Sequence, residues 1–425
     1  MTQLPKLKEL SFLVYGLGIS GKSVVKFFEK NKIYNFKVWD DKQKNFFKKH
    51  KTNNLKKTLN EVDYIVLSPG ISLLKNRKLS KFKSKIITDI DLFYLTNAKC
   101  KTIVVTGTNG KSTTCKLLDH LLKKNKKKSL LGGNIGTPIL DLKNIKNSFV
   151  IIEASSYQLS HSKFIKPDFA FFLNLTNDHL DWHKNMKNYL NSKLKIFFLQ
   201  TKNNYAIINN NLKRFFIKRN FSSKLITLKN THYKKVKHKV MNEYLKSNLN
   251  DENMGFVYIF SKLLGIKEKS FISSMGSFRG LPHRFEIFLK KKNITFINDS
   301  KATSFEATQT ALSSLKNIYW ILGGLPKKGD KIKLSNYKKN IVKCYIIGKS
   351  TNFFKSQIRG KLNFKITKNL KKSILQIFKD IKLKRSIDNS IILSPAAASF
   401  DQFKNFEDRG DKFKKLCKIY ARKYT

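Results

Sequence analysis

Short apolar runs recur along the whole chain, and many of them end directly before small or polar residues. Runs of about four to eight apolar residues with such borders are typical of buried parallel strands. Between the runs, apolar residues recur at helical spacing, as in the stretch that follows Gly110. This alternation predicts an α/β protein built from largely parallel, doubly wound sheets. The expected strands span residues 12–15, 36–39, 64–67, 149–152, 169–173, 205–208, 294–298, 318–322, 344–348 and 391–395.

The segment from Thr106 to Thr113 reads Thr-Gly-Thr-Asn-Gly-Lys-Ser-Thr, between a β-branched run and a helical pattern. Backbone N–H groups of such a turn can bind phosphate oxygens, while Lys111 neutralises the β/γ-phosphates and the Ser112 hydroxyl binds Mg²⁺. The common form of this motif has a first glycine where the chain has Val105. An ordinary glycine-rich turn is the alternative, but the strand before it and the helix after it favour a phosphate loop.

A second glycine motif, Gly16-x-Gly18-x-x-Gly21, follows the first expected strand. The acidic pair Asp40-Asp41 comes about 20 residues later, at the end of the second strand, which is the spacing of a dinucleotide-binding, Rossmann-like domain. Taken alone, the motif suggests an NAD-dependent oxidoreductase. Its glycines would serve any nucleotide that places a pyrophosphate at the helix N-terminus.

Polar residues follow the expected strands 149–152 and 169–173, beginning at Glu153 and at Asn174. The carboxyl ends of parallel strands are where open α/β sheets bind ligands. We therefore expect Glu153 and the segment 174–181 to lie beside the phosphate loop. A glycine-rich turn is expected at 131–136, and the chain breaks near the Gly280–Pro282 segment.

Composition adds one unusual feature, a formal net charge of +58 over 425 residues. The lysines are spread along the chain together with Asn, Ile and Phe, all of which have A/T-rich codons, so genome composition explains the excess. A nucleic-acid binder is the alternative, and DNA binding that survives moderate salt would support it. Four distant cysteines without a C-x-x-C pattern and no apolar run of ~18 residues predict a cytoplasmic protein.

With these pieces in order, the chain resembles the Mur ligases of peptidoglycan synthesis. The phosphate loop of that family also lacks the first glycine. The D-glutamate-adding branch of the family is indicated by three further motifs, at residues 280–286 (Gly-Leu-Pro-His-Arg-Phe-Glu), 299–303 (Asp-Ser-Lys-Ala-Thr) and 393–403 (Leu-Ser-Pro-Ala-Ala-Ala-Ser-Phe-Asp-Gln-Phe). The resemblance covers nearly the whole chain, although residues 202–247 match poorly. The absence of a D-N-P-R sequence speaks against the branch that adds diaminopimelate or lysine.

The resemblance implies three domains, each with a largely parallel doubly wound sheet. They are a Rossmann-like UDP-substrate domain (1–97), a P-loop-type ATPase domain (98–281) and a Rossmann-like amino-acid domain (282–425). The resemblance implies a ligase that depends on ATP and Mg²⁺ and joins D-glutamate to UDP-N-acetylmuramoyl-L-alanine through an acyl phosphate. It also implies a monomer, as most of the family are, and a domain-closure step. Another amino-acid-adding Mur ligase or a folate-type ligase is the nearest alternative.

The resemblance also implies site residues, which fall into four groups. The catalytic group is Lys111, Asn134, Glu153, His179, Lys193 and Lys301, and the metal ligands are Ser112, Glu153, His179 and Lys193, the last as a carbamate. The ATP group is Gly107, Thr108, Asn109, Gly110, Lys111, Ser112, Thr113, Asn253 at adenine, Asp299 at the ribose side and Arg284 at the phosphates. The UDP-substrate group is Gly18, Ile19, Ser20, Asp40, Asp41, Lys42 and Gly70. The D-glutamate group is Lys301, Thr303, Lys327, Ser399, Phe400 and Phe406, where motif register alone selects Lys327 over Lys328.

Overall fold

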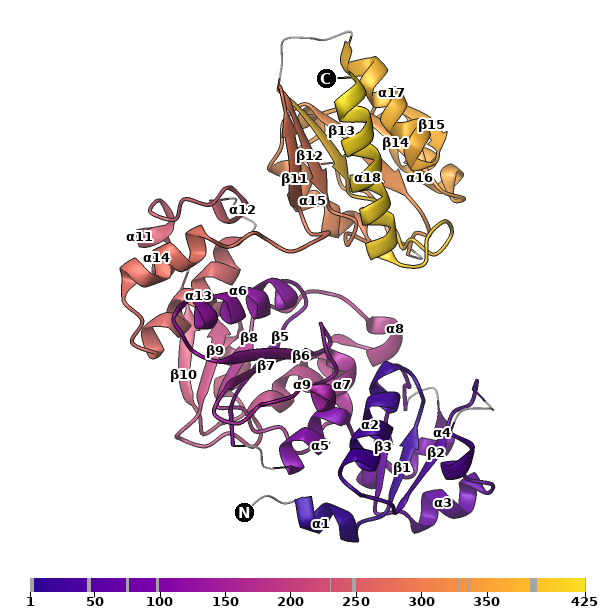
Figure 1. The fold of residues 1–425 in the computed structure, drawn as a ribbon, viewed down its shortest axis with the longest axis vertical. Helices are drawn as coiled ribbons and strands as arrows, with labels where there is room; N and C mark the ends of the chain where they lie inside the picture. Colours follow the sequence, from indigo (N-terminus) through magenta and orange to yellow (C-terminus); the bar gives the residue numbers. More distant parts are fainter. Residues whose placement is uncertain are drawn as a thin grey trace. The chain divides into compact units, whose positions relative to one another are not determined.

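The structure is a computed structural model (Figure 1) that describes residues 4–43, 47–73, 76–96, 99–229, 231–246, 250–327, 329–334, 337–382 and 388–424. The chain divides into two compact units, each described by itself below. The first unit comprises Met1–Val240 and Glu252–Gly276, and the second comprises Met241–Asp251 and Ser277–Thr425. The predicted border between residues 97 and 98 and the alternative residue Lys328 lie outside the described residues.

The N-terminal part of the first unit is a four-stranded parallel sheet in the order β2-β1-β3-β4. Successive residues of β1 point to opposite faces, so Phe12 and Val14 pack with α2 and α5, whereas Leu13 and Tyr15 pack with α3 and α4. Both faces are therefore covered. The strands are β1 (Phe12–Tyr15), β2 (Phe36–Trp39), β3 (Tyr64–Leu67) and β4 (Ile86–Ile87), and the helices are α1 (Leu4–Glu9), α2 (Ile19–Lys30), α3 (Leu55–Glu61), α4 (Arg77–Ser80) and α5 (Asp89–Leu95).

A six-stranded parallel sheet in the order β10-β9-β8-β5-β7-β6 forms the rest of the first unit. Helices α6 and α13 cover one face of this sheet, and α7 and α9 cover the other (Figure 1). The strands are β5 (Lys101–Thr106), β6 (Ser129–Gly133), β7 (Phe149–Glu153), β8 (Phe169–Phe172), β9 (Tyr205–Asn209) and β10 (Lys224–Leu228). The helices are α6 (Lys111–Lys124), α7 (Ser156–His161), α8 (Leu180–His183), α9 (Met186–Leu194), α10 (Lys213–Ile217), α11 (Thr231–Lys237), α13 (Asp251–Leu263) and α14 (Glu268–Gly276).

The prediction of a turn over residues 131–136 was wrong for its first half, because Leu131, Gly132 and Gly133 belong to strand β6. The glycines fit a strand here because other backbone lies very close. A Cβ on Gly133 would come within 2.5 Å of the Glu153 carbonyl oxygen, and one on Gly132 within 2.8 Å of the Thr137 carbonyl oxygen. The helical residues that begin within the segment 174–181 are divided between α8, α9 and a 3₁₀ turn at Lys195–Phe197.

A buried carboxylate joins the two sheets of the first unit. Asp91 in α5 is fully buried, and its Oδ1 accepts hydrogen bonds from the backbone N–H groups of Lys163 (2.9 Å) and Phe164 (2.8 Å). Its Oδ2 accepts from the backbone N–H and the hydroxyl of Thr88, which caps the same helix. Four donors therefore compensate for the burial of this charge and fix α5 against the segment that leads into β8.

The second unit contains a six-stranded sheet in the order β11-β12-β16-β13-β14-β15. Only β11 runs antiparallel to its neighbour. Helices α17 and α18 pack on one face, and α15 and α16 pack on the other. The strands are β11 (Glu286–Lys291), β12 (Ile294–Asn298), β13 (Ile318–Gly323), β14 (Ile341–Ile347), β15 (Phe364–Lys368) and β16 (Asn389–Leu393). The helices are α12 (Glu243–Lys246), α15 (Phe305–Ser313), α16 (Thr351–Ile358), α17 (Leu370–Lys382) and α18 (Phe406–Tyr424). Three largely parallel, doubly wound sheets confirm the predicted fold class.

The contacts of Asp91 lead to a stability prediction. Asp91→Asn should lower the free energy of unfolding of the first unit by about 2–4 kcal/mol, because one acceptor oxygen is lost and two buried donors then face an amide NH₂ group. Urea unfolding followed by circular dichroism measures the effect. Glu61→Gln, which changes an exposed carboxylate of the same unit, is the control. An unfolding midpoint equal to that of the wild type would contradict the assigned role of Asp91.

Candidate active site

The predicted site residues of the first unit gather at the carboxyl edge of its six-stranded sheet. Strand β5 lies between β7 and β8, and the phosphate loop, Glu153 and the segment that carries His179 follow these three strands. Cross-strand hydrogen bonds fix the edge, from the Thr106 hydroxyl to the Ala154 carbonyl oxygen (3.0 Å) and from the Leu173 N–H to the Thr106 carbonyl oxygen (2.9 Å). The sequence predicted this juxtaposition because each of these segments directly follows an expected parallel strand.

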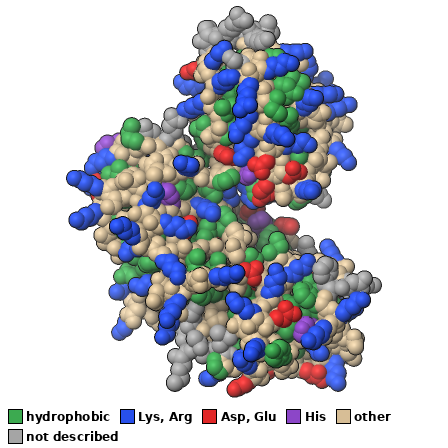
Figure 2. Space-filling model, in the orientation of Figure 1, with side chains coloured by type: hydrophobic (Ala, Val, Ile, Leu, Met, Phe, Trp, Pro, Cys, Tyr) green, Lys and Arg blue, Asp and Glu red, His purple; other side chains and the backbone are tan. Residues whose placement is uncertain are grey.

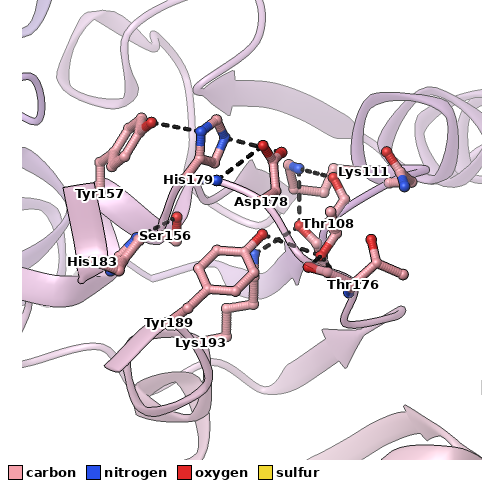
Figure 3. A network of polar contacts seen from close by, with 12 residues as sticks. Thr108, Lys111, Ser156, Tyr157, Thr176, Asp178, His179, His183, Tyr189 and Lys193 are labelled. Atoms are coloured by element: carbon pink, nitrogen blue, oxygen red, sulfur yellow. Dashed lines mark hydrogen bonds and ion pairs between the residues drawn. The ribbon is translucent and has the colours of Figure 1, made fainter. Parts of the chain in front are cut away.

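Two lysines meet on one carbonyl oxygen of the phosphate loop. The Nζ of Lys111, at the start of α6, donates to the carbonyl oxygens of Gly107 (2.9 Å) and Thr108 (2.8 Å). The Nζ of Lys193, in α9, donates to the same Gly107 oxygen at 2.7 Å. Figure 3 shows both side chains reaching this stretch of the loop. Two of the three predicted catalytic lysines, Lys111 and Lys193, are therefore brought together, although they are 82 positions apart in the sequence (193 − 111).

The environment of Lys193 opposes its positive charge. Its side chain is 1% exposed and lies over the Tyr189 ring, with Nζ 4.6 Å from the ring centroid. Burial lowers the pKa of Lys193 well below its ordinary value, and the charge of Lys111 lowers it further, while Asp178 acts in the opposite direction. The neutral amine of Lys193 is thereby favoured.

Buried Glu153 at the end of β7 pairs with Asn134, an exposed residue directly after β6. The Nδ2 of Asn134 donates to Oε1 of Glu153 at 2.8 Å, and the Asn134 N–H donates to the Glu153 carbonyl oxygen. Glu153 is 2% exposed, and within the described part of the chain its Oε2 is buried without a hydrogen-bond partner. A buried carboxylate oxygen with no donor fits a cation, so the residues present are compatible with Mg²⁺.

His179 lies in a polar network with Tyr157 and Asp178 (Figure 3). Its Nδ1 is 2.7 Å from the Tyr157 hydroxyl, and its Nε2 is 3.3 Å from Oδ2 of Asp178. A neighbouring histidine, His183, contacts the Ser156 hydroxyl, and burial lowers the pKa of His183 to about 4. Among the described residues, no group of three or more His, Cys, Asp or Glu side chains is arranged to hold a metal ion. A metal site here therefore needs oxygen donors of other kinds, such as the predicted hydroxyl and carbamate.

Asn174, which the sequence placed beside the phosphate loop without a specific role, contacts that loop. Its Oδ1 accepts from the backbone N–H groups of Thr108 (3.1 Å) and Asn109 (2.8 Å), and its Nδ2 donates to Glu252 (2.9 Å). Nothing distinguishes Asn174 in the sequence except its position directly after an apolar run. Beside it, the predicted adenine contact Asn253 is buried and accepts a hydrogen bond from the Thr114 hydroxyl. Ser112 and Thr113 are buried at the start of α6.

The predicted UDP-substrate residues lie around the glycine turn of the N-terminal sheet. Gly18 is the N-cap of α2, and Ile19 is 79% exposed. Asp40 and Asp41 line a cavity of about 350 Å³ whose other walls the sequence did not predict, namely Leu17, Val38, Trp39, Gln43, Lys51, Thr52 and Asn53. Ser20, Lys42 and Gly70 do not line this cavity. Partial burial acts to raise the pKa of Asp40, but backbone N–H donors from Leu17, Lys42 and Gln43 outweigh it and lower the pKa.

In the second unit, the predicted D-glutamate residues follow three adjacent parallel strands. Lys301 and Thr303 follow β12, Ser399 and Phe400 follow β16, and Lys327 follows β13. The last two loops are joined by reciprocal hydrogen bonds of 2.9 Å between Leu325 and Ala398. The Nζ of Lys301 lies 3.7 Å from the centroid of the Phe406 ring. These side chains therefore share one edge, where Ser399 is buried and Phe400 is 71% exposed.

Asp299 and Arg284, the predicted ATP contacts of the second unit, lie near each other. Asp299 is buried and accepts from the Ser394 hydroxyl (2.6 Å) and the Phe285 N–H (3.1 Å). Burial raises the pKa of Asp299 to about 7, against the opposing effects of these two hydrogen bonds and of the Arg284 charge. The carboxyl group thus holds loops of its own unit together.

The fold and the phosphate loop define a class of protein, and comparison with known families identifies it. The family described as Mur ligase middle domain matches residues 105–278, and the one described as Mur ligase MurD-like, N-terminal domain, matches residues 10–88. The chain belongs to the Mur ligase family, whose members are ATP-dependent ligases.

Relatives that align with most of this chain carry the name UDP-N-acetylmuramoylalanine--D-glutamate ligase. The protein of that name from Rickettsia prowazekii is 36% identical over 95% of this chain and 97% of its own length. The one from Rickettsia felis is 35% identical over 97% and 98%, and one from Francisella tularensis subsp. tularensis is 37% identical over 84% and 86%.

Solved structures support the fold. The MurF ligase of Thermotoga maritima in complex with ADP aligns with a TM-score of 0.58 at 17% identity, covering 99% of both chains. A MurF structure from Acinetobacter baumannii aligns with a TM-score of 0.59 at 12% identity, covering 99% of this chain and 98% of that one. In the part of the chain that the structure describes, no helix combines the length and the apolar character needed to cross a membrane.

The turn at Gly110 leads to a prediction for ATP binding. Gly110 has a φ of +81°, and a Cβ there would come within 2.3 Å of the Asn253 Oδ1. Gly110→Ala should weaken ATP binding by tenfold or more, because both the strained backbone and the displaced Asn253 shift the phosphate loop. Isothermal titration with ATP measures the change. Gly265→Ala is the matched control, since Gly265 has a φ of +67° and no atom within 4 Å of its added Cβ. Equal ATP affinities for the two variants would contradict this role of the contact.

Proposed function

We propose that this chain forms an amide bond between D-glutamate and the alanine carboxylate of UDP-N-acetylmuramoyl-L-alanine, with ATP as the phosphoryl donor, in peptidoglycan precursor synthesis. The observation that carries the proposal is the convergence of Lys111, Lys193 and Glu153 on the edge beside the phosphate loop. The near full-length similarity to ligases of this name supports the choice of substrates.

The chemistry explains why the site needs so much positive charge. A carboxylate oxygen of the alanine attacks the γ-phosphorus, ADP leaves, and the resulting acyl phosphate is attacked by the neutral amine of D-glutamate. The tetrahedral intermediate then expels phosphate, and the amine proton passes to solvent. Because the first step brings together two anions, Lys111 is assigned to stabilise the charge on the transferring phosphoryl group.

We assign Ser112 and Glu153 to hold one Mg²⁺ beside this loop, and His179 and carbamylated Lys193 to hold a second Mg²⁺. When bound, Mg²⁺ supplies charge neutralisation for the phosphate oxygens. Asn134 holds Oε1 of Glu153 and so directs the other oxygen, Oε2, away from itself. Lys193 gains its carbamate when its neutral amine adds to CO₂ and releases one proton. Burial and the neighbouring Lys111 favour that neutral amine.

The three ligands are assigned to three sets of residues. Phosphate-loop residues 107–113 and Asn253 bind ATP, together with Arg284 and Asp299. Gly18, Ile19, Ser20, Lys42, Gly70 and the cavity lined by Asp40 and Asp41 bind the UDP substrate. Lys301 and Lys327 pair with carboxylates of D-glutamate, and Thr303, Ser399, Phe400 and Phe406 orient it. The UDP-substrate set falls in the predicted domain 1–97 and the D-glutamate set in 282–425. The ATP set falls in 98–281 except for Arg284 and Asp299, which belong to 282–425. We further assign the enzyme to the cytoplasm and to a monomeric state.

One assay tests the reaction as a whole. Phosphate release by the full chain should require ATP, UDP-N-acetylmuramoyl-L-alanine and D-glutamate together. In a panel of D-Glu, L-Glu, L-Lys and D-Ala, only D-Glu should support release. ATP turnover that is indifferent to the amino acid would reject the proposal, and turnover with another member of the panel would reassign the substrate.

Lys193→Ala tests the carbamate assignment. Phosphate release should fall by two orders of magnitude or more, since an anionic ligand of the metal site is lost. A short-chain carboxylic acid added to the variant should restore part of the rate, because its carboxylate can occupy the vacated volume. Lys187→Ala, which removes an exposed lysine from the same helix, should retain wild-type activity. Failure of every such acid to restore activity would count against the carbamate.

A further inference from the structure

The first turn of α18 carries a buried arginine that the proposed reaction does not use. Arg409 is 1% exposed, and its guanidinium group donates to four neutral oxygens. Its Nε donates to the Ser300 hydroxyl (3.0 Å), its Nη2 to the carbonyl oxygens of Ser300 (2.8 Å) and Ala397 (3.0 Å), and its Nη1 to that of Gly323 (3.5 Å). Ser300 and Ala397 lie in the loops that follow β12 and β16, and Gly323 is the last residue of β13, where the third loop begins.

This burial is unusual for the chain. The sequence has 86 Lys and Arg residues, and among those that the structure describes only Lys193 and Arg409 are buried. Within the same described residues, no carboxylate forms an ion pair with Arg409. Backbone and hydroxyl oxygens provide its hydrogen bonds, and the charge of Asp401 also favours the protonated guanidinium. Burial lowers the pKa of Arg409 to about 10, which leaves the group charged at neutral pH. A buried guanidinium charge without hydrogen-bond acceptors would destabilise the fold. The three loops are therefore held in the geometry that places their oxygen atoms against the guanidinium group.

Backbone and side-chain atoms of the neighbouring loops pack closely around the guanidinium group. A Cβ on Gly324 would come within 3.2 Å of Nη1 of Arg409 and within 2.3 Å of the Ala398 carbonyl oxygen. Ser300 is fully buried, and its hydroxyl also donates to the Phe406 carbonyl oxygen at 2.8 Å, which ties the start of α18 to the same loop.

The three loops are those that carry the residues assigned to D-glutamate. Ser300 directly precedes Lys301, Ala397 lies two residues before Ser399, and the Gly323 loop continues to Lys327. We propose that Arg409 is a positioning residue for the D-glutamate site, which fixes the spacing of Lys301, Lys327 and Ser399 without touching the substrate. This inference rests on the proposed function for the identity of the amino acid.

The test compares Michaelis constants in Arg409→Lys, measured on the full chain with saturating ATP and UDP-N-acetylmuramoyl-L-alanine. A lysine keeps the charge but cannot reach all four acceptors with the planar geometry of a guanidinium. The KM for D-glutamate should rise tenfold or more, while the KM for ATP should stay within twofold of the wild type. KM is independent of the fraction of folded enzyme, so simple destabilisation does not reproduce this pattern. A KM for D-glutamate within twofold of the wild type would overturn the proposal.

Phe413→Leu is the matched control, because Phe413 lies one turn further along α18 and packs in the core against Phe288. It should lower stability without changing either KM. Should Arg409→Lys fail to fold, Ser300→Ala removes one acceptor of the same cluster, and a threefold or larger rise in the KM for D-glutamate is expected. An unchanged KM in Ser300→Ala would then overturn the proposal.

Hydrogen exchange separates this inference from the proposed function. Backbone amides of residues 299–303, 323–327 and 394–400 should exchange at least tenfold faster in Arg409→Lys or Ser300→Ala than in the wild type. In Phe413→Leu, the exchange rates of these amides should be unchanged. Unaltered exchange in the Arg409 and Ser300 variants would overturn the positioning role. A wild-type chain that releases no phosphate with D-glutamate would instead reject the proposed function, while the exchange data would still report on Arg409.

Discussion

Two lysine side chains donate to the carbonyl oxygen of Gly107, and the rest of the site depends on this arrangement. Two amines with limited access to water cannot both carry full positive charge at low cost, so an anion or the loss of a proton stabilises the pair. Lys111 donates hydrogen bonds to the phosphate loop. Burial and the charge of Lys111 lower the pKa of Lys193 and so favour its neutral form. The proposed roles of this pair, polyphosphate binding by Lys111 and carbamate formation at Lys193, both rest on this electrostatic environment.

Parallel sheet geometry makes this arrangement possible. Adjacent parallel strands end at the same edge, so β5, β7 and β8 deliver the phosphate loop, Glu153 and His179 to neighbouring positions without any local sequence relation. The sheet of the second unit repeats the principle with β12, β16 and β13, whose loops carry Lys301, Ser399 and Lys327. Each unit thus presents polar side chains at one edge and keeps its apolar residues between the sheet and its helices.

Buried charges hold segments that are distant in sequence, and the chain uses both signs for this purpose. Asp91 accepts four hydrogen bonds and joins α5 to the segment before β8, whereas Arg409 donates four and joins three loops of the second unit. Among the residues that the structure describes, nearly all other Lys and Arg side chains are at least partly exposed. Figure 2 shows Lys and Arg side chains distributed over the visible face rather than gathered in one patch.

The sequence by itself determined the α/β class, most central strands and the phosphate loop. Buried parallel strands require continuous apolar runs, and the turns at Gly16 and Gly110 require residues that tolerate positive φ, so both features are visible locally. Edge strands β11 and β15 were missed because their solvent-facing residues break the apolar run. Tertiary structure alone decided that Asn174 holds the phosphate loop and that Arg409, among 86 basic residues, is buried. Burial and hydrogen-bond partners arise from segments far apart in the chain, and no local pattern of residues records them.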